Sequence, residues 1–226
     1  MKISICIATY EMRSFGSTYV DESLSKIAEQ TYKNIQVVIS DHSQDDKIFK
    51  VCEKWKKTLD IKYLKKDYDI TNASGNFNNA IKNSDGDYIK LLCCDDFLTN
   101  GNSIQQTVDV IRSNPDAKWF ASSFIHTNNP EKCIPYYSDT LITGVNTIGC
   151  QSGITIKNDD QKIYFDEKYL WLMDCDYYIN YYKKYGDPII INEPTITIRI
   201  SSNQLTNIIP QAEKNNELNL IKNKYI

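Results

Sequence analysis

The sequence has few of the features that mark nucleic-acid-binding, membrane-spanning or secreted proteins. Its net charge is −3, and no stripe of basic residues alternates with aromatic ones. A nucleic-acid groove needs such a stripe, so a role on DNA or RNA is disfavoured. No apolar run approaches the roughly 20 residues of a membrane-spanning helix, and the chain starts with a strand-like segment instead of a signal peptide. We therefore expect a cytoplasmic protein, with any membrane contact peripheral and at the inner face.

The seven cysteines are scattered, with no CxxC pair and no Cys/His cluster at zinc-binding spacing. Their odd number and wide spacing fit a reducing cytosol better than a disulfide framework. Cys6 and Cys93 lie inside apolar strand patterns, where cysteine usually behaves as a small hydrophobic residue. The cysteine pattern therefore predicts no disulfide framework.

Apolar runs of strand length alternate with segments of helical periodicity. The pattern predicts strands at 2–9, 35–40, 61–64, 88–92 and 119–124, then a short strand near 154 and β-like pieces at 188–200. It predicts helices at about 17–30, 44–58, 73–83, 104–111 and 169–185. Strands that alternate with helices form a parallel sheet with right-handed crossovers. We therefore expect an α/β, Rossmann-like, mostly parallel sheet flanked by helices in a single domain.

Two segments lack a clear pattern. The stretch from His126 to Gly149 is polar and irregular and contains two prolines. A loop of that length is usually functional or mobile, and we treat it as a candidate lid. The last ~15 residues, rich in Asn and Lys, predict a solvated helix or a frayed tail.

The most informative stretch is Gly86–Leu98, where an apolar strand ends at two adjacent carboxylates, Asp95 and Asp96. Ligands of open α/β sheets sit just beyond the carboxyl ends of the strands. Two neighbouring acids repel each other unless a cation lies between them, which favours a bound divalent metal. The alternative is a solvated Asp-Asp turn that caps the following helix.

Several short motifs occur in a fixed order along nearly the whole chain, from residue 3 to about residue 206. They are Ile7–Glu11, Gln30–Asp41, Asn76–Asn78 followed by Gly86–Ile89 and the acid pair, Phe165–Glu167, Met173–Asp176, and Asn192–Pro194 before Arg199. No single motif is specific, but their ordered co-occurrence resembles the family-2 glycosyltransferases of the GT-A fold. The resemblance implies an inverting, metal-dependent enzyme that uses a nucleotide-sugar, with a UDP-sugar as the expected donor.

In that family the turn after the first strand and the acid that closes the second strand hold the nucleotide base. The resemblance therefore places Thr9 and Tyr10 at the base, with the Tyr10 ring stacked on it, and makes Asp41 a hydrogen-bond acceptor. It also places Asn76 and Asn78 beside the nucleotide, where amides both donate and accept. Structural roles stay open for these residues. Tyr10 could be a strand-end aromatic that covers the core, and Asp41 could form an Asx turn or cap the following helix. Asn76 and Asn78 could belong to a polar helix face.

By the same resemblance the acid pair is a metal and diphosphate site. Asp96 is the expected metal ligand, and Asp95 is expected to meet the ribose or a metal-bound water. The ion would be Mn²⁺ or Mg²⁺, which prefer oxygen ligands and leave sites for water and substrate phosphates. Cys93 stands where fuller forms of the motif carry another Asp.

The general base that the family implies is Asp174, which would take the proton of the acceptor hydroxyl. Met173 replaces the Glu that often precedes this Asp, and Asp176 is the second choice. The structural alternative for Asp174 is an exposed acid in the first turn of a helix, where it complements the dipole. The chain also has Ser201 where many members have a His two residues after the Arg that corresponds to Arg199.

We therefore expect a single GT-A domain over 1–226, with a nucleotide-sugar-binding half at about 1–98 and an acceptor-binding half at about 99–226. The expected reaction transfers a sugar to a hydroxyl of a saccharide or lipid-linked saccharide, in cell-surface polysaccharide or glycoconjugate synthesis. Two alternatives stay open. A sugar nucleotidyltransferase needs a Gly-rich basic loop after the first strand, where residues 10–16 offer only Arg13 and Gly16. A catalytically silent nucleotide-sugar-binding module would keep the fold and lose the base.

Overall fold

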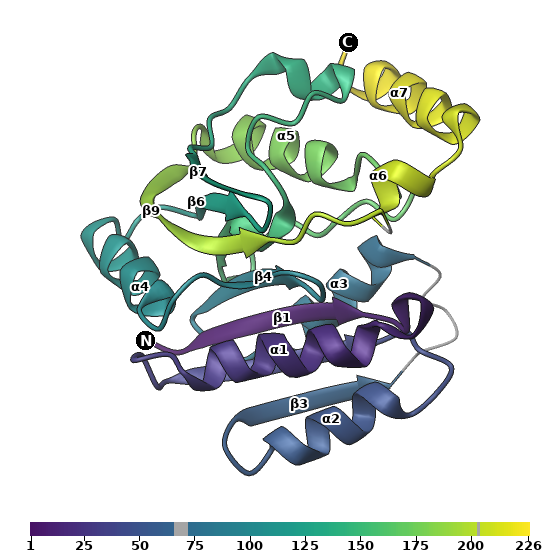
Figure 1. The fold of residues 1–226 in the computed structure, drawn as a ribbon. Helices are drawn as coiled ribbons and strands as arrows, with labels where there is room; N and C mark the ends of the chain where they lie inside the picture. The colour runs from purple at the N-terminus through teal and green to yellow at the C-terminus, as the bar shows by residue number, and fades with distance from the viewer. Residues whose placement is uncertain (66–71, 203) are drawn as a thin grey trace.

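The computed structural model describes residues 1–65, 72–202 and 204–226 (Figure 1). Within these residues the strands form one mixed sheet in the order β3-β2-β1-β4-β8-β6-β9-β5, and β7 pairs with β6 off this path. The strands are β1 (Ile3–Thr9), β2 (Ile35–Asp41), β3 (Asp60–Lys65), β4 (Tyr88–Cys93), β5 (Phe97–Leu98), β6 (Trp119–His126), β7 (Asn129–Cys133), β8 (Ile154–Lys157) and β9 (Ile189–Ile198). The helices are α1 (Gly16–Ala28), α2 (Lys47–Trp55), α3 (Ala73–Lys82), α4 (Ser103–Ser113), α5 (Met173–Tyr185), α6 (Leu205–Ile208) and α7 (Gln211–Tyr225).

The first half of the sheet is parallel. β2 pairs with β1 and β3, and β1 pairs with β4, all in parallel register. The chain returns between these strands through α1, α2 and α3, because parallel strands need a crossover connection. The carboxyl ends of β1, β2 and β4 therefore meet at one edge, where Thr9, Asp41 and Cys93 are the last strand residues. The Rossmann-like expectation is confirmed for this half.

Two apolar cores cover the two faces of the sheet. Residues of α1, α2 and α4 pack on one face, where Ile5 and Leu92 are buried. Residues of α3 and α5 pack on the other, against Cys6 and Leu91. Because successive side chains of a strand point to opposite faces, a strand buried on both faces must be apolar throughout. This explains the near-continuous apolar runs in the sequence.

The second half extends the same sheet with antiparallel pairs. β8 is antiparallel to both β4 and β6, and β9 runs parallel to β6. The two-residue β5, which follows the acid pair, is antiparallel to β9. This pairing brings the end of β9 back to the acid pair, so that the Arg199 N–H lies 2.9 Å from Asp96 Oδ1.

Two segments differ from the sequence-based expectation. Residues 126–149 are not one irregular loop, because β7 forms a hairpin with β6 and a 3-10 turn covers Asp139–Thr143. Of the two alternatives for the C-terminal residues, the structure shows the helix: α7 has 15 residues, most of them exposed, and the unexpected feature is that it docks through buried Ile221 and Glu217. Hairpin pairing and the docking of a mostly polar helix depend on distant partners, which a local pattern does not contain.

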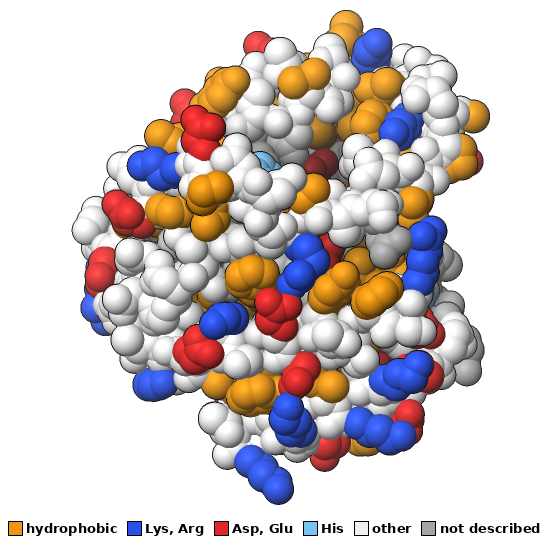
Figure 2. Space-filling model, viewed as in Figure 1, with side chains coloured by type: hydrophobic (Ala, Val, Ile, Leu, Met, Phe, Trp, Pro, Cys, Tyr) orange, Lys and Arg blue, Asp and Glu red, His pale blue; other side chains and the backbone are white. Residues whose placement is uncertain are grey.

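Charge is mixed on the molecular surface. On the face shown in Figure 2, acidic and basic side chains alternate over the region of α1 and α2 and do not gather by sign. Among the described residues, no helix combines the length and apolar content needed to cross a bilayer.

Candidate active site

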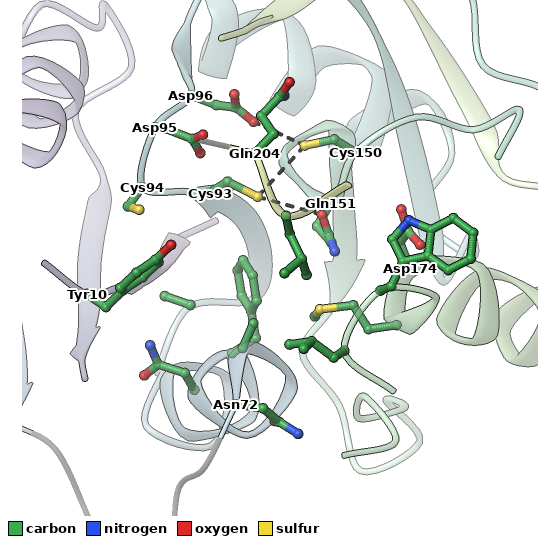
Figure 3. Close-up of a pocket in the computed structure, with 18 of the residues that line it drawn as sticks. Tyr10, Asn72, Cys93, Cys94, Asp95, Asp96, Cys150, Gln151, Asp174 and Gln204 are labelled. Carbon is green, nitrogen blue, oxygen red and sulfur yellow. Dashed lines mark hydrogen bonds between the residues drawn. The ribbon is translucent and has the colours of Figure 1, made fainter. Parts of the chain in front are cut away.

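A cavity of about 430 Å³ opens at the edge where β1 and β4 end (Figure 3). Tyr10 lies on one side and Asp174 on the opposite side, with Asp95 and Asp96 along the wall between them. Asn72, just before α3, lies across from the acid pair. These residues come from separate segments, so the topology of the sheet creates the cavity at the position where α/β proteins bind ligands.

The turn after β1 presents an aromatic ring to the cavity. Tyr10 is 45% exposed, so its face is available for stacking on a flat ligand. Thr9 is buried, and its backbone carbonyl accepts hydrogen bonds from the His42 N–H at 2.8 Å and the Asn76 side-chain amide at 3.1 Å. The structure therefore brings Thr9, Tyr10 and Asn76 together, with Tyr10 and Asn76 lining the cavity and Thr9 outside it, and their contact with a nucleotide stays a prediction.

Asp41 is fully buried at the end of β2, and it does not line the cavity. Its Oδ1 accepts the Ser43 N–H at 2.9 Å, and its Oδ2 accepts the Tyr63 hydroxyl at 2.6 Å. Burial and this hydrogen bond raise the pKa of Tyr63 well above its ordinary value of 10. The Ser43 contact is the Asx-type turn of the structural alternative, and the contact of Asp41 with a base stays a prediction.

Asn78 is also turned away from the cavity. Its amide donates to the Phe165 carbonyl at 2.9 Å and to Glu167 Oε1 at 3.1 Å, while its Oδ1 accepts the Phe165 N–H at 2.9 Å. Asn78 therefore ties α3 to the segment before α5. Its part in donor binding stays a prediction, whereas Asn76, two residues earlier, lines the cavity.

Asp96 is 3% exposed, and protein donors occupy its carboxylate. Its Oδ2 accepts the Ser152 hydroxyl at 2.6 Å and the Cys150 thiol at 3.1 Å, and its Oδ1 accepts the Arg199 N–H at 2.9 Å. Burial raises the pKa of this carboxyl, although the three hydrogen bonds act in the opposite direction. Asp96 thus holds the turn after β4 to the segments that follow it.

Asp95 is half-buried and lines the cavity. In the described part of the chain, its own backbone N–H is the one hydrogen-bond donor to its carboxylate, and the charge of Arg199 acts on it from nearby. Burial, followed by the charge of Asp96, raises its pKa to about 7. Both effects disfavour a negative charge, and a bound cation would offset both. The expectation that Asp96 is the metal ligand stays a prediction, while the geometry favours Asp95 as the available oxygen donor.

Asp174 lies in the first turn of α5 and lines the cavity. Its Oδ2 accepts the Asn146 side-chain amide at 2.7 Å, and its Oδ1 accepts the Cys175 N–H at 2.7 Å. Burial raises its pKa to about 6 in spite of these hydrogen bonds. A carboxylate with this pKa is ionised at neutral pH and is a stronger base than an exposed one.

Asp176 points to a different side of α5. It is fully buried, with an ion pair to Lys224 at 2.8 Å and a hydrogen bond from the Tyr225 hydroxyl at 2.6 Å. Both partners belong to α7, so Asp176 anchors this helix. The two acids of the motif therefore lie on different sides of α5. Asp174 faces the cavity, and Asp176 faces α7.

The sequence reading missed the segment that supports the acid pair. Cys150 and Ser152 lie in a short turn, and Ser152 Oγ also accepts the Cys93 N–H at 2.9 Å. Gly149 has a φ of +97°, a backbone conformation that favours glycine. Glycines on both sides of Cys150–Ser152 are the signal that marks this turn in the sequence.

Arg199 is likewise held in place around the acid pair. Its Nε donates to the Asp95 carbonyl at 2.9 Å, its guanidinium pairs with Glu22, and its charge lies over the Tyr19 ring at 4.5 Å. Ser201, where the family often has a His, does not line the cavity, and its carbonyl accepts the Asn207 side-chain amide at 3.0 Å.

The fold and the cavity together define a class, the Rossmann-like α/β proteins with an acidic ligand site at the carboxyl ends of parallel strands. The model of the family described as "Glycosyl transferase family 2" matches residues 4–133, which is more than half of the chain. The protein belongs to this family, as the resemblance in the sequence predicted.

The chain spans less than two thirds of the length of each of the following relatives. The UDP-Glc:alpha-D-GlcNAc-diphosphoundecaprenol beta-1,3-glucosyltransferase WfaP of Escherichia coli is 36% identical over 95 residues, which cover 42% of this chain and 36% of WfaP. The crystal structure of S. aureus TarS 1–349 in complex with UDP-GlcNAc has a TM-score of 0.71 at 18% identity, over 98% of this chain and 65% of that chain. The mannosyltransferase PcManGT from Pyrobaculum calidifontis, in complex with GDP-Man and Mn²⁺, has a TM-score of 0.62 at 15% identity, over 88% of this chain and 56% of that chain. The structural matches establish the GT-A-type α/β fold.

Proposed function

We propose that the protein is an inverting glycosyltransferase that moves a sugar from a UDP-sugar to a hydroxyl of a lipid-linked saccharide. One observation carries the proposal. A single cavity holds an available carboxylate at the strand ends, Asp95, and a half-buried carboxylate of raised pKa on the opposite side, Asp174. The first carboxylate can hold a cation against the diphosphate of a donor, and the second can accept a proton from an acceptor hydroxyl.

The acid pair fits a hard divalent cation. In the described part of the chain, no other residue donates a hydrogen bond to the Asp95 carboxylate, and burial and the charge of Asp96 outweigh the opposing charge of Arg199, so its pKa is raised. Oxygen ligands of this kind suit Mn²⁺ or Mg²⁺, and we assign Asp95 to hold the ion with Asp96 as its support. When bound, such an ion neutralises the charge that develops on the diphosphate leaving group. PcManGT, which shares the fold, was solved with Mn²⁺.

Other residues of the cavity bind the donor and activate the acceptor. The exposed ring of Tyr10 stacks on the base of the donor, and Asn76 keeps that turn in place through the Thr9 carbonyl. Asp174 accepts the proton of the acceptor hydroxyl while the oxygen attacks the anomeric carbon. Attack opposite the departing diphosphate in one displacement inverts the anomeric configuration. Asn146 orients Asp174 through its hydrogen bond of 2.7 Å.

The proposed acceptor class comes from WfaP, which is 36% identical over 95 residues, against 18% and 15% for the two solved structures. WfaP is named for action on a diphosphoundecaprenol-linked sugar. A lipid-linked acceptor would place this protein in the cytoplasm at the inner face of a membrane, as a peripheral protein. The product would serve the synthesis of a surface polysaccharide or glycoconjugate.

A thermal-shift panel tests the donor assignment. UDP-, GDP-, dTDP- and CMP-sugars are added with and without Mn²⁺, and the UDP-sugars with Mn²⁺ should raise the melting temperature most, because a ligand that binds the folded state stabilises it. Asp95→Asn should lose the Mn²⁺-dependent part of the shift. Asp160→Asn, at an exposed acid, is the matched control and should keep it. Absence of any shift with all donors would contradict the proposal and favour a module without donor binding.

A further inference from the structure

The cavity wall contains a second group of metal-ligating atoms beside Asp95. The sulfurs of Cys93 and Cys150 and a carboxylate oxygen of Asp96 all lie within 4.8 Å of one another. Cys93 ends β4, and Cys150 lies 57 residues later, at the start of the turn before β8. All three residues line the cavity, and Figure 3 shows their side chains converging.

We propose that Cys93, Cys150 and Asp96 bind a thiophilic divalent cation of the zinc class. Zn²⁺ takes thiolate ligands at about 2.3 Å in tetrahedral geometry, which puts two ligating sulfurs roughly 3.8 Å apart. The Cys93 and Cys150 sulfurs are 3.8 Å apart. The same geometry puts a sulfur and a carboxylate oxygen roughly 3.5 Å apart. Cys150 Sγ lies 3.1 Å from Asp96 Oδ2, within a few tenths of an ångström of that value, and Cys93 Sγ lies within 4.8 Å of the Asp96 oxygen.

Geometry favours this site over a disulfide between the same cysteines. A disulfide needs the sulfurs at about 2.05 Å, so they would have to approach each other by roughly 1.8 Å. Both cysteines are free thiols in the structure. The Cys150 thiol points to Asp96, and Cys93 Sγ lies 3.6 Å from Gln151 Oε1, so each sulfur faces a further ligand atom.

The surroundings support a metal site as well. Ser152 donates its hydroxyl to Asp96 Oδ2 at 2.6 Å and accepts the Cys93 N–H at 2.9 Å. One serine therefore orients two of the three ligand residues, as outer residues of metal sites do. Gln151 also lines the cavity, so its Oε1 or a water molecule supplies the fourth ligand from that side.

The thiophilic site and the site for Mn²⁺ or Mg²⁺ differ in chemistry but share Asp96. The hard ion uses the oxygens of Asp95, whereas the thiophilic ion uses two sulfurs. An ion on the thiols would replace the hydrogen bond that the Cys150 thiol donates to Asp96 Oδ2, and Asp95 is the adjacent residue. We expect Zn²⁺ to weaken Mn²⁺-dependent donor binding. This consequence rests on the proposed function, but binding of the thiophilic ion does not.

Titration with Co²⁺ tests the site directly. Tetrahedral cobalt bound by thiolates shows charge-transfer absorption and intense d–d bands, which octahedral cobalt on oxygen ligands lacks. The reduced protein should take up Co²⁺ with these bands, and Zn²⁺ should displace it. Cys93→Ser and Cys150→Ser should each remove about half of the charge-transfer absorbance and weaken binding by at least about tenfold. The double variant should show no such band.

Cys133→Ser is the matched control, because Cys133 lies on β7 outside the cluster, and its spectrum should equal that of the unmodified chain. Far-UV circular dichroism verifies that each variant is folded. The absence of a charge-transfer band in the unmodified protein, or an equal band in the folded double variant, overturns the proposal. A protein that shows the cobalt bands but binds no nucleotide-sugar overturns the proposed function alone.

Discussion

Among the described residues, burial moves the pKa of two acids and one lysine toward neutral pH, because it disfavours their charged forms. Burial raises the pKa of Asp95 to about 7 and that of Asp174 to about 6, and it lowers the pKa of Lys90 from 10.5 to about 7. The two acids line the cavity, but Lys90 lies in the centre of the sheet on β4. Burial therefore serves the proposed chemistry at Asp95 and Asp174, whereas at Lys90 it only lowers the stability of the fold.

Asp174→Asn should lower the rate of sugar transfer by about 100-fold or more, because the amide cannot accept the proton of the acceptor hydroxyl. Donor affinity should be unchanged, which a titration with the UDP-sugar measures. In the unmodified enzyme kcat should rise with pH through about 6, as Asp174 loses its proton. Equal turnover in the variant, or a rate that falls as pH rises through 6, would contradict the assignment of the base.

Lys90→Met should stabilise the protein. Lys90 is fully buried, its Nζ has no hydrogen-bond partner among the described residues, and Cys150 is the titratable neighbour that acts on it. The folded pKa lies below the unfolded value, so the unfolded state binds more protons between pH 7 and 10.5, and stability rises with pH over that interval. The variant should therefore gain on the order of 4 kcal/mol at pH 7 and less at pH 9.5.

Urea unfolding at the two pH values measures this gain. Lys57→Met, at an exposed lysine, is the control and should change stability little at either pH. A gain for Lys90→Met that is equal at pH 7 and pH 9.5 would show that the ammonium charge is not the cause.

At the scale of elements, α7 fixes the start of α5. The buried carboxylate of Glu217 accepts the backbone N–H groups of Leu170, Trp171 and Leu172 at 2.8–3.2 Å, just before the helix begins. A helix start leaves N–H groups without partners, and a carboxylate there also complements the helix dipole. Because Asp174 lies in the first turn of α5, α7 holds the proposed base in position without touching the cavity.

Glu217→Ala should destabilise the protein by roughly 2–4 kcal/mol, because it leaves three backbone donors without their acceptor. It should also lower kcat more than it weakens donor binding, since the start of α5 loses its anchor. Denaturant unfolding and steady-state kinetics measure the two effects. Glu213→Ala, at an exposed acid of the same helix, should do neither. A Glu217→Ala variant as stable as the original chain would contradict this role of α7.

At the scale of the whole molecule, the proposed donor and acceptor halves share one sheet. β8 joins β4, and β5 at residues 97–98 pairs with β9, so strands of each half complete the other. The two apolar cores lie on opposite faces of this sheet, and each contains residues of both halves. The proposed division near residue 98 therefore does not separate two folding units.

Thermal unfolding should show a single cooperative transition whose calorimetric and van't Hoff enthalpies agree. A fragment of residues 1–98 should not fold alone, because it would expose the edge of β4 and the faces of both cores. Calorimetry and circular dichroism of the fragment measure these outcomes. Two separate transitions, or a folded fragment, would contradict the single domain over 1–226.

Much of the fold follows from the sequence. The parallel half of the sheet, its crossover helices and the acids at the strand ends are set by apolar periodicity and by the points where it stops. The short β5, the β7 hairpin and the docking of α7 do not follow from it. Each depends on pairing with a distant segment, and a two-residue strand or a polar helix carries almost no local pattern.

The candidate site shows the same division. The sequence by itself determined that acids and an aromatic residue gather where the strands end, because strand ends are a local property. Only the tertiary structure decided which carboxylates accept hydrogen bonds from other side chains. Tyr63 donates its hydroxyl to Asp41 and Ser152 donates its hydroxyl to Asp96, whereas the Asp95 carboxylate faces the cavity. It also placed Cys150 beside Cys93, a contact between residues 57 positions apart. Hydrogen-bond partners and ligand clusters are set by how distant segments pack, which no local spacing records.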